Sequence, residues 1–218
     1  MLVITERDKR IFEWLFRVKY VTIEQLSRYM QMSKHAVYKR VEKLQKEGYL
    51  DGANLYGNRK YFSNGIKIRN GAKRKADREK VNILISSLEH HMKVTDFFLY
   101  LLDNEVKEEM IFTSRDVFRT RIGISDNRKR IYKVPDLVIR RDDQRLIAIE
   151  IELSRKNDDT LSQVFDNYIL YTNYAAVYYV CNKKAVKNLI NRTVRKKMIN
   201  FIRAYDVSEF ETEFIFRG

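Results

Sequence analysis

The stretch Val134-Pro135-Asp136-Leu137-Val138-Ile139, followed by Leu146-Ile147-Ala148-Ile149-Glu150-Ile151-Glu152, decides the fold of the second part of this chain. Both runs have the length and the branched apolar residues of strands, and the only proline of the chain opens the first. Side chains alternate between the two faces of a strand, so Glu150 and Glu152 point the same way. If the two strands are neighbours, Asp136 lies close to both acids.

Three carboxylates on an otherwise apolar sheet suit a divalent cation, because magnesium prefers oxygen ligands. We therefore expect Asp136, Glu150 and Glu152 to be the ligands if this domain holds magnesium, and the catalytic acids if it is an enzyme. The alternative is a structural ion pair, since acids that face the same way repel each other unless a cation lies between them. Candidate cations close in sequence are Arg140, Arg155 and Lys156.

The rest of residues 81–218 alternates between helix and strand patterns. Helices are expected at 88–102, 160–171 and 184–199, and strands at 110–112, 175–181 and either 201–207 or 210–216, with a further strand edge near 116–121. A helix, three strands, a helix and a strand form the core order of restriction-endonuclease-like folds. We therefore predict an α/β (α+β) domain of that kind over 81–218.

Residues 1–65 are expected to form three short helices and a β-hairpin. Thr5 and Thr22 each begin a pattern typical of a capping box, and Ser33 precedes a third helix with apolar residues at helical spacing. Gly48 follows at a C-terminal cap position, and 49–62 has the turn residues of two short strands around a loop. Three compact helices followed by a basic hairpin are typical of a winged helix-turn-helix domain.

In such a domain the third helix enters the major groove of DNA, and the hairpin, or wing, touches the backbone or the minor groove. The core stripe of the third helix is Val37, Val41 and Leu44, so residues off this stripe face outward. The candidate DNA-binding residues are Lys34, His35, Tyr38, Lys39, Arg40, Lys43, Arg59 and Lys60, with Lys46 as a further phosphate contact. For any single lysine, an ordinary solvated side chain is the alternative.

Positive charge is concentrated in the first part of the chain. Residues 1–80 hold 20 Lys and Arg against 9 Asp and Glu, a net charge of +11, whereas residues 81–218 hold 23 against 20. A concentrated basic segment favours a polyanionic partner, because each phosphate that is neutralised releases counterions. We therefore expect double-stranded DNA as the partner. Residues 66–80, polar and basic without a core stripe, are expected to form a linker.

Residues 81–218 resemble nucleases of the PD-(D/E)xK type, in which an aspartate opens one strand and a (D/E)-x-K triplet closes the next. Pro135-Asp136 matches the first element and Glu150 the second, but Glu152 stands at the lysine position. The resemblance implies that the acids hold magnesium and that a lysine positions or activates water. Lys156 and Lys133 are the candidates to supply that lysine. Because the motif is incomplete, we favour a binding protein over an enzyme.

The chain as a whole resembles the replication-relaxation family of plasmids and integrative elements in Gram-positive bacteria. The resemblance rests on three stretches: Ile4-Thr5-Glu6-Arg7-Asp8, then Glu89-His90-His91-Met92-Lys93-Val94-Thr95-Asp96, then Val134-Pro135-Asp136 with Ile149-Glu150-Ile151-Glu152-Leu153-Ser154-Arg155. It implies a role in plasmid replication, DNA relaxation or conjugative transfer. His90 and His91 point about 100° apart on a helix, so they do not form a metal site like that of a relaxase.

Three functions follow as hypotheses: a double-stranded DNA-binding protein at an origin of a mobile element, a magnesium-dependent endonuclease or nickase, and a transcriptional repressor. We favour the first, with replication or transfer proteins as further partners. A homodimer is expected for each, because winged-helix proteins commonly bind paired half-sites. The sequence has no signal-peptide pattern and no apolar run of about 18 residues, so we expect a cytoplasmic protein without a membrane partner.

Overall fold

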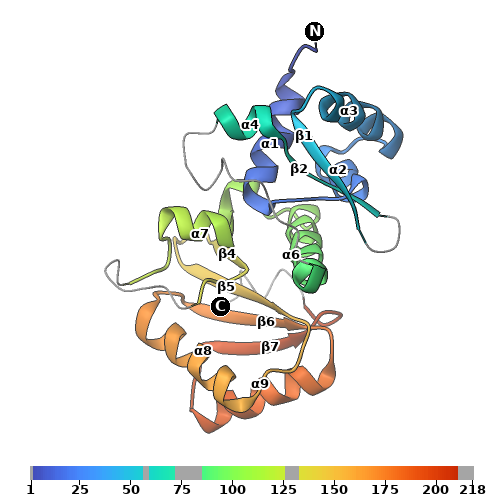
Figure 1. Ribbon diagram of the computed structural model, residues 1–218. Coiled ribbons are helices and arrows are strands. Elements are labelled where there is room, and N and C mark those ends of the chain that lie inside the picture. The colour runs from blue at the N-terminus through green and yellow to red at the C-terminus, as the bar shows by residue number, and fades with distance from the viewer. Residues whose placement is uncertain (1, 56–58, 72–84, 126–132, 211–218) are drawn as a thin grey trace. The chain divides into compact units, whose positions relative to one another are not determined.

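The computed structural model describes residues 2–55, 59–71, 85–125 and 133–210 (Figure 1). The chain divides into two compact units, Met1–Leu99 and Tyr100–Gly218, each with a sheet of its own. Both units combine helices with strands, which confirms the predicted mixed class (α+β). Among the described helices, none is long and apolar enough to cross a lipid bilayer.

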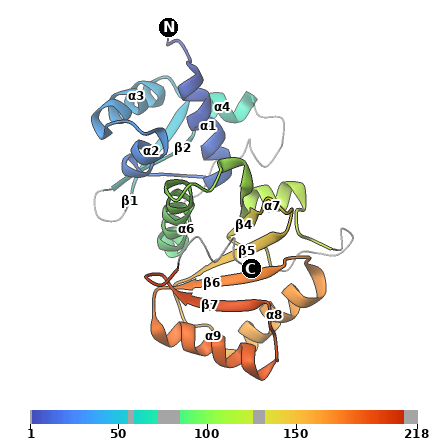
Figure 2. The same cartoon turned by 180° about the vertical axis from the view of Figure 1, so that it is seen from behind.

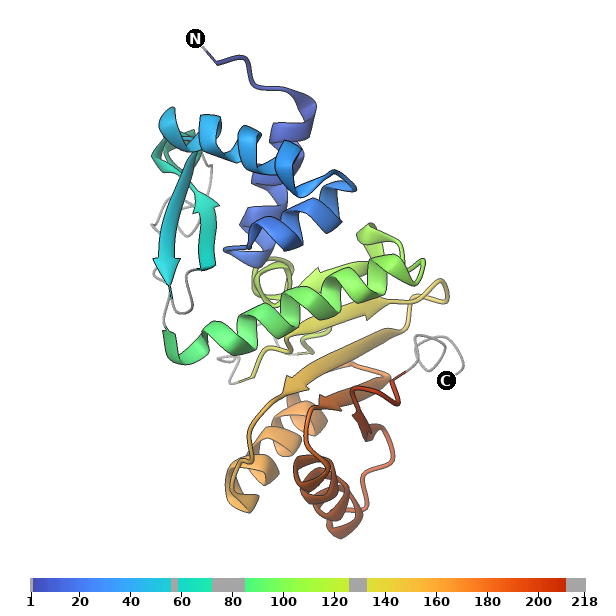
Figure 3. The same cartoon turned by 90° about the vertical axis from the view of Figure 1, so that its right-hand side faces the viewer.

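The first unit is a winged helix-turn-helix, as predicted for residues 1–65. Its elements are α1 (Glu6–Val18), α2 (Ile23–Met30), α3 (Lys34–Lys46), β1 (Leu50–Leu55), β2 (Arg59–Asn64), α4 (Ile66–Gly71) and the part of α6 (Ile85–Asp103) up to Leu99. The strands β1 and β2 pair antiparallel and form the hairpin, which lies beside α3 in Figure 3. The wing and the third helix are therefore the neighbours that the sequence pattern predicted.

Side-chain caps fix where the three helices of this unit begin. Thr5 with Asp8 forms a capping box at α1, and Thr22 with Gln25 forms a second one at α2. In each box the threonine hydroxyl and the partner side chain accept hydrogen bonds from each other's backbone N–H, which satisfies donors that a helix start leaves open. Ser33 caps α3 through its hydroxyl oxygen. The three predicted helix starts are therefore confirmed.

Trp14 is at the centre of the core of the first unit. Its fully buried ring stacks on Tyr29 of α2, with 4.1 Å between ring centroids, and lies 6.3 Å from the ring of Phe98 on α6. A β-bridge between Val21 and Phe62 joins the hairpin to the segment between α1 and α2. Because large aromatic rings bury much apolar surface, these contacts fix the helices and the hairpin relative to one another.

The segment predicted as a linker, 66–80, begins as the helix α4. Arg69 of α4 is only 8% exposed and donates hydrogen bonds to the carboxylate of Asp51 and to the backbone oxygen of Asn64, the second at 2.7 Å. This guanidinium holds α4 against the wing, so it does not supply the phosphate contact expected of a basic linker. Residues 72–80 lie outside the described part of the chain.

The helix α6 belongs largely to the first unit, whereas the sequence placed it in a domain over 81–218. Two contacts explain the difference. Gln25 Nε2 donates to Asp96 Oδ1 at 2.9 Å, and the guanidinium of Arg17 lies 5.1 Å from the ring centroid of Phe98. The helical pattern predicted that this segment is a helix, but it does not specify which core the apolar face joins.

The second unit is built on a five-stranded mixed sheet in the order β3-β4-β5-β6-β7. Pairs β3–β4 and β4–β5 are antiparallel, and pairs β5–β6 and β6–β7 are parallel. Its elements are η1 (Glu108–Met110), β3 (Ile111–Thr113), α7 (Ser114–Thr120), β4 (Leu137–Arg140), β5 (Leu146–Glu152), α8 (Asp158–Tyr171), β6 (Ala176–Cys181), α9 (Lys184–Lys196) and β7 (Ile202–Asp206). Three antiparallel strands, a helix and a parallel strand follow one another as predicted.

The helices α8 and α9 connect the parallel strands and cover the same face of the sheet (Figures 1 and 2). One sequence expectation needs correction here, and one pair of alternatives is decided. The strand edge expected near 116–121 is the helix α7, which Thr113 and Asp116 start with a capping box. The final strand is Ile202–Asp206, in agreement with the first of the two alternatives, and most of the second, 210–216, lies outside the described residues.

Gly65, between the wing and α4, provides a test of this packing. A Cβ added there would lie 2.5 Å from the backbone oxygen of Gly48 and 2.7 Å from the carbonyl carbon of Tyr49, whereas one added at Gly71 meets nothing within 4 Å. Because backbone atoms do not give way easily, we expect Gly65→Ala to lower the free energy of unfolding by about 1–3 kcal/mol. Gly71→Ala is the matched control and should leave it unchanged or slightly higher.

The measurement is urea unfolding followed by the fluorescence of Trp14, the only tryptophan of the chain, which reports on the first unit. Equal midpoints for the two variants would mean that α4 is not held as closely to the wing as the structure has it.

Candidate nucleic-acid interface and acidic cluster

The outer side of α3 is basic and exposed. Val37, Val41 and Leu44 on the opposite side are at most 3% exposed, so helical spacing turns the residues between them toward solvent. The exposed residues of this side are Lys34, His35, Tyr38, Lys39, Lys43 and Lys46, which we call the α3 face. The structure thus brings six of the predicted DNA contacts together on one side of one helix.

Two ion pairs restrain this face without burying it. Lys34 Nζ lies 3.5 Å from Glu24 Oε1, and Lys46 Nζ lies 3.9 Å from Glu42 Oε1. All four side chains are at least 48% exposed. Such pairs contribute at most about 1 kcal/mol and are screened by salt. A phosphate group therefore competes readily with these acids for the two lysines.

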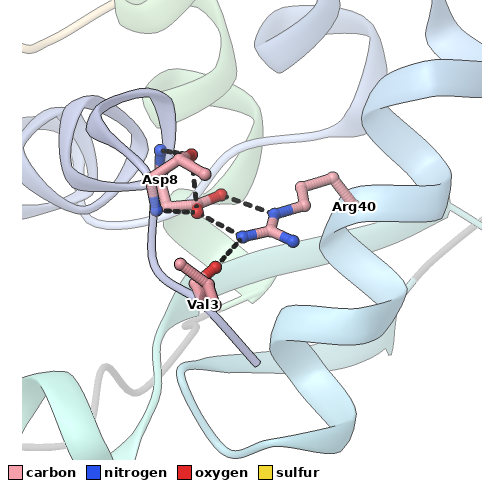
Figure 4. Close-up of polar contacts among 4 residues, drawn as sticks. Val3, Asp8 and Arg40 are labelled. Carbon is pink, nitrogen blue, oxygen red and sulfur yellow. Dashed lines mark hydrogen bonds and ion pairs between the residues drawn. The ribbon is translucent and has the colours of Figure 1, made fainter. Parts of the chain in front are cut away.

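Arg40 has a different role from the predicted one, because its guanidinium is bound within the fold (Figure 4). Its Nε donates to Asp8 Oδ1 at 2.8 Å, and its Nη2 donates to Asp8 Oδ2 and, at 2.7 Å, to the backbone oxygen of Val3. The Asp8 side chain is 1% exposed, so the pair is largely removed from water. Moving Arg40 to a phosphate would leave this carboxylate buried without its cation, which is costly. The prediction of Arg40 as a phosphate contact is therefore corrected.

Of the two wing residues predicted to contact DNA, Lys60 and Arg59, the structure describes the side chain of Lys60 alone. Lys60 donates a hydrogen bond from Nζ to Gln45 Oε1 of α3 at 2.8 Å, and its ammonium lies 5.4 Å from the ring centroid of Phe62. Lys60 therefore links the wing to α3 and is partly buried. Arg59 begins β2, but its side chain lies outside the described part of the structure, as do the wing residues 56–58.

In the second unit, the sheet register brings Asp136 next to Glu150. Leu137 of β4 pairs with Ile149 of β5 in antiparallel register. Asp136, which precedes Leu137, therefore lies beside Glu150, which follows Ile149. Asp136 Oδ2 accepts a hydrogen bond from the backbone N–H of Ile151 at 2.8 Å, which fixes the carboxylate at the end of β5. The two acidic strands are antiparallel neighbours, which meets the condition under which Asp136 was expected to lie close to the acids.

Glu150 is the most buried acid of this cluster, at 2% exposure. Its Oε2 lies 2.8 Å from Lys133 Nζ, and its Oε1 accepts a hydrogen bond from the hydroxyl of Tyr168 on α8. On the neighbouring strand Tyr179 pairs with Glu150 in the register, and its ring is fully buried. Both carboxylate oxygens of Glu150 are thus engaged by side chains of this chain.

Glu152 lies at the lysine position of the motif and carries its own partner, since it forms an ion pair with Lys156 four residues later. The described residues contain no group of three or more His, Cys, Asp or Glu side chains placed to hold one metal ion. The expected magnesium ligands Asp136, Glu150 and Glu152 are instead each bound by a donor of the protein. Placed in this way, the three acids do not fit a magnesium site, so no chemical step through the metal follows.

Burial and charge act together on the titrating groups of this cluster. Burial alone would lower the pKa of Lys133, but the Glu150 and Asp136 carboxylates outweigh it and raise this pKa. Burial, with the nearby positive charge of Lys133, lowers the pKa of Lys156. Burial and the neighbouring Glu150 raise the pKa of Tyr168 well above its usual value, so this hydroxyl keeps its proton and donates a hydrogen bond to Glu150.

Two residues of these sites escaped the sequence analysis. The capping pattern assigned Asp8 to the start of α1 but carried no sign of its pairing with Arg40, which lies 32 residues away. Tyr168 belongs to a helix rich in aromatic residues, where packing is the ordinary role, and only the tertiary structure shows its hydroxyl at Glu150. Neither pairing has a signal in local spacing, because each joins elements distant in sequence.

Comparisons with known proteins give little further guidance. No protein-family model matches the chain, and no curated protein matches it. The solved structures similar to this chain include MepR, a transcription regulator of the Staphylococcus aureus multidrug efflux pump MepA, and the adhesin competence repressor AdcR from Streptococcus pyogenes. MepR is 12% identical with a TM-score of 0.27, over 55% of this chain and 75% of its own. AdcR is 16% identical with a TM-score of 0.25, and the match covers 54% of this chain and 75% of AdcR. At these TM-scores the likeness does not bear on the fold or the function of this chain.

The Asp8–Arg40 pair generates a prediction about stability. Asp8→Asn keeps the size of the side chain and removes its charge, which leaves the guanidinium of Arg40 without its anion. Arg40 is 28% exposed and can recover some hydration, so we expect a loss of about 2 kcal/mol, below the roughly 3–5 kcal/mol of a fully buried pair. Glu42→Gln, which removes the anion of an exposed pair on the same helix, should have little effect. Urea unfolding followed by Trp14 fluorescence measures both.

The same pair predicts how stability depends on pH. Burial alone would raise the pKa of Asp8, but the hydrogen bonds from Arg40 and Thr5 outweigh it and lower this pKa below its ordinary value of 3.8. A carboxyl group with a lowered pKa in the folded state stabilises the fold above its unfolded value and loses this effect as the pH falls through the folded value. The stability difference between the wild type and Asp8→Asn should therefore stay constant from neutral pH to about pH 5 and shrink below pH 3.8. A difference that already shrinks near pH 6 would contradict this.

Proposed function

We propose that this chain is a cytoplasmic, double-stranded DNA-binding protein that binds through the α3 face. The observation that carries the proposal is the position of six basic or polar side chains on the exposed side of the third helix of a winged helix-turn-helix. In folds of this kind the N-terminal half of the third helix reaches base edges. His35, Tyr38 and Lys39 lie in that half, whereas Lys43 and Lys46 are placed for phosphates.

Charge supports the same proposal. The first 80 residues carry a net charge of +11, whereas the remainder is nearly balanced. Two of the cations of this segment, Arg40 and Arg69, are bound to buried or partly buried acids and belong to the fold. The lysines of the α3 face are exposed and have at most weak surface partners, so their charge is available to a polyanion.

The biological setting of the proposal comes from the resemblance to the replication-relaxation family. We place the protein on a plasmid or integrative element, at an origin where it acts in replication, DNA relaxation or conjugative transfer. A homodimer bound to paired half-sites would double the contacts of the α3 face, and replication or transfer proteins would be its further partners. A transcriptional repressor would use the same face, so the binding tests below apply to both roles.

One observation favours the nuclease alternative. Asp136 and Glu150 lie side by side at the end of two antiparallel strands, as the acids of a PD-(D/E)xK nuclease do. Against it stand the acid at the motif's lysine position and the pairing of Glu150 and Glu152 with Lys133 and Lys156. We therefore assign the second unit a role as a scaffold and not as the catalyst of strand cleavage.

Binding to a short duplex of random sequence tests the proposal directly. Measured by fluorescence anisotropy, the logarithm of affinity should fall linearly with the logarithm of salt concentration, by about 0.9 per phosphate contact. Lys39→Ala and Lys43→Ala should each weaken binding several-fold at low salt, and the loss of a phosphate contact should reduce the slope by about 0.9. Lys196→Ala removes the same charge from an exposed position of α9 and should leave both quantities unchanged.

A wild-type affinity that does not respond to salt would refute DNA binding. Equal losses in Lys39→Ala, Lys43→Ala and Lys196→Ala would mean that net charge, and not the α3 face, determines binding.

Incubation with supercoiled plasmid in magnesium or manganese separates the scaffold from the nuclease. We expect the plasmid to be shifted but intact, for the wild type and for Asp136→Ala/Glu150→Ala alike. Nicked or linear product that disappears in the double variant would establish cleavage by this site and overturn the assignment.

A further inference from the structure

We infer that Lys133 and Lys156 take the place of a divalent cation in the acidic cluster of the second unit. The cluster consists of Asp136, Glu150 and Glu152 with these two lysines, and Tyr168 closes it from α8. It is therefore a metal-independent element of the fold, in which ammonium groups provide the neutralisation that the arrangement of acids demands.

Lys133 is the principal internal cation. Its ammonium lies 2.8 Å from Glu150 Oε2, and its charge acts on Asp136 as well. Lys133 is 25% exposed and Glu150 only 3%, so the contact is formed at the edge of the core with its anion inside. A buried carboxylate of this kind is stable only beside a positive charge or strong hydrogen-bond donors. Lys133 supplies the positive charge, and Tyr168 supplies the hydrogen-bond donor.

Lys156 neutralises the acid that breaks the motif. Glu152 stands where a PD-(D/E)xK sequence has its lysine, and Lys156 follows four residues later and forms an ion pair with it. The side chain of Glu152 is 9% exposed and that of Lys156 is 30% exposed. A positive charge thus lies beside the motif position, although the residue at that position is an acid.

A divalent ion would have to displace these donors one by one. Magnesium keeps several water ligands and demands near-ideal octahedral geometry. Here both oxygens of Glu150 are engaged, one by Lys133 and one by Tyr168, and an oxygen of Asp136 holds the backbone N–H of Ile151. An added charge of +2 would also lie beside two ammonium groups, whose repulsion opposes binding. The intact cluster therefore disfavours the binding of a divalent cation, although its acids resemble the ligands of such an ion.

Removal of an internal cation should reverse this preference. In Lys133→Met the apolar stem is kept and the charge is lost, so Glu150 and Asp136 lose the ammonium group that interacts with both of them. The variant should be less stable in the absence of metal, and the same acids should then accept a divalent cation. Binding of the ion restores stability by mass action, because the ion binds the folded state.

The experiment uses the full chain and manganese as the probe. Free Mn²⁺ is followed by electron paramagnetic resonance, and the melting temperature is followed by far-ultraviolet circular dichroism in EDTA and in Mn²⁺. The wild type should bind no Mn²⁺ that depends on Asp136 and should melt at the same temperature in both buffers. Lys133→Met should melt at least about 5 °C lower in EDTA and regain most of the loss in Mn²⁺.

Two controls make the result specific. Lys187→Met removes a lysine with a similar exposure, 24%, that pairs with Glu209 on the surface of the same unit, and it should show neither effect. Adding Asp136→Asn to Lys133→Met should abolish the response to Mn²⁺. If Lys133→Met does not fold, Lys156→Met provides the same comparison at a more exposed ammonium, and the wild-type titration remains informative by itself.

Three results would overturn the inference: Mn²⁺ binding by the wild type that is lost in Asp136→Asn, an unchanged melting temperature of Lys133→Met, or a destabilised Lys133→Met that Mn²⁺ does not restore.

Discussion

A carboxylate that leaves water needs a cation or strong donors from the same chain, and each unit of this protein contains such a group. In the first unit it is Asp8, which is held by Arg40 and by the cap of α1. In the second it is Glu150, which is held by Lys133 and Tyr168. Each pairing joins segments far apart in sequence, so each one also fixes the packing of the elements that carry its members.

This constraint divides the basic residues of α3 into two sets. Arg40 lies on the side of the helix that meets α1, and the cost of an unpaired Asp8 keeps it there. Lys39 and Lys43 lie on the other side, and no buried acid among the described residues pairs with them. A count of positive charges therefore overstates what is offered to DNA. The α3 face is smaller than the sequence suggested, but it is also better defined, because the helix beneath it is fixed by a buried ion pair.

The need to neutralise buried carboxylates also applies to the acidic cluster of the second unit, which resembles that of a nuclease in its acids and differs from it in their partners. The sheet register places two acids together where β4 begins and β5 ends, and metal-dependent cleavage uses acids that lie together in this way. Acids brought together in this way must be neutralised, and a lysine does so as readily as a metal ion. With Lys133 and Lys156 in that role, the arrangement is stable without an ion. The scaffold role proposed for the second unit is consistent with this neutralisation.

The sequence by itself determined the order of the main helices and strands and the capped starts of α1, α2 and α3, because these depend on local periodicity and capping. It placed Asp136 beside the acidic strand only on the condition that the two strands are neighbours, and the register meets that condition. It did not determine that α6 joins the first unit, that α7 is a helix, or that Arg40 serves Asp8. Nor did it decide between metal and ammonium at Glu150, although it named Lys133 and Lys156 as nearby candidates. Those outcomes depend on which distant side chains meet in the folded chain, since a buried charge takes its partner from its surroundings in space and not from its neighbours in sequence.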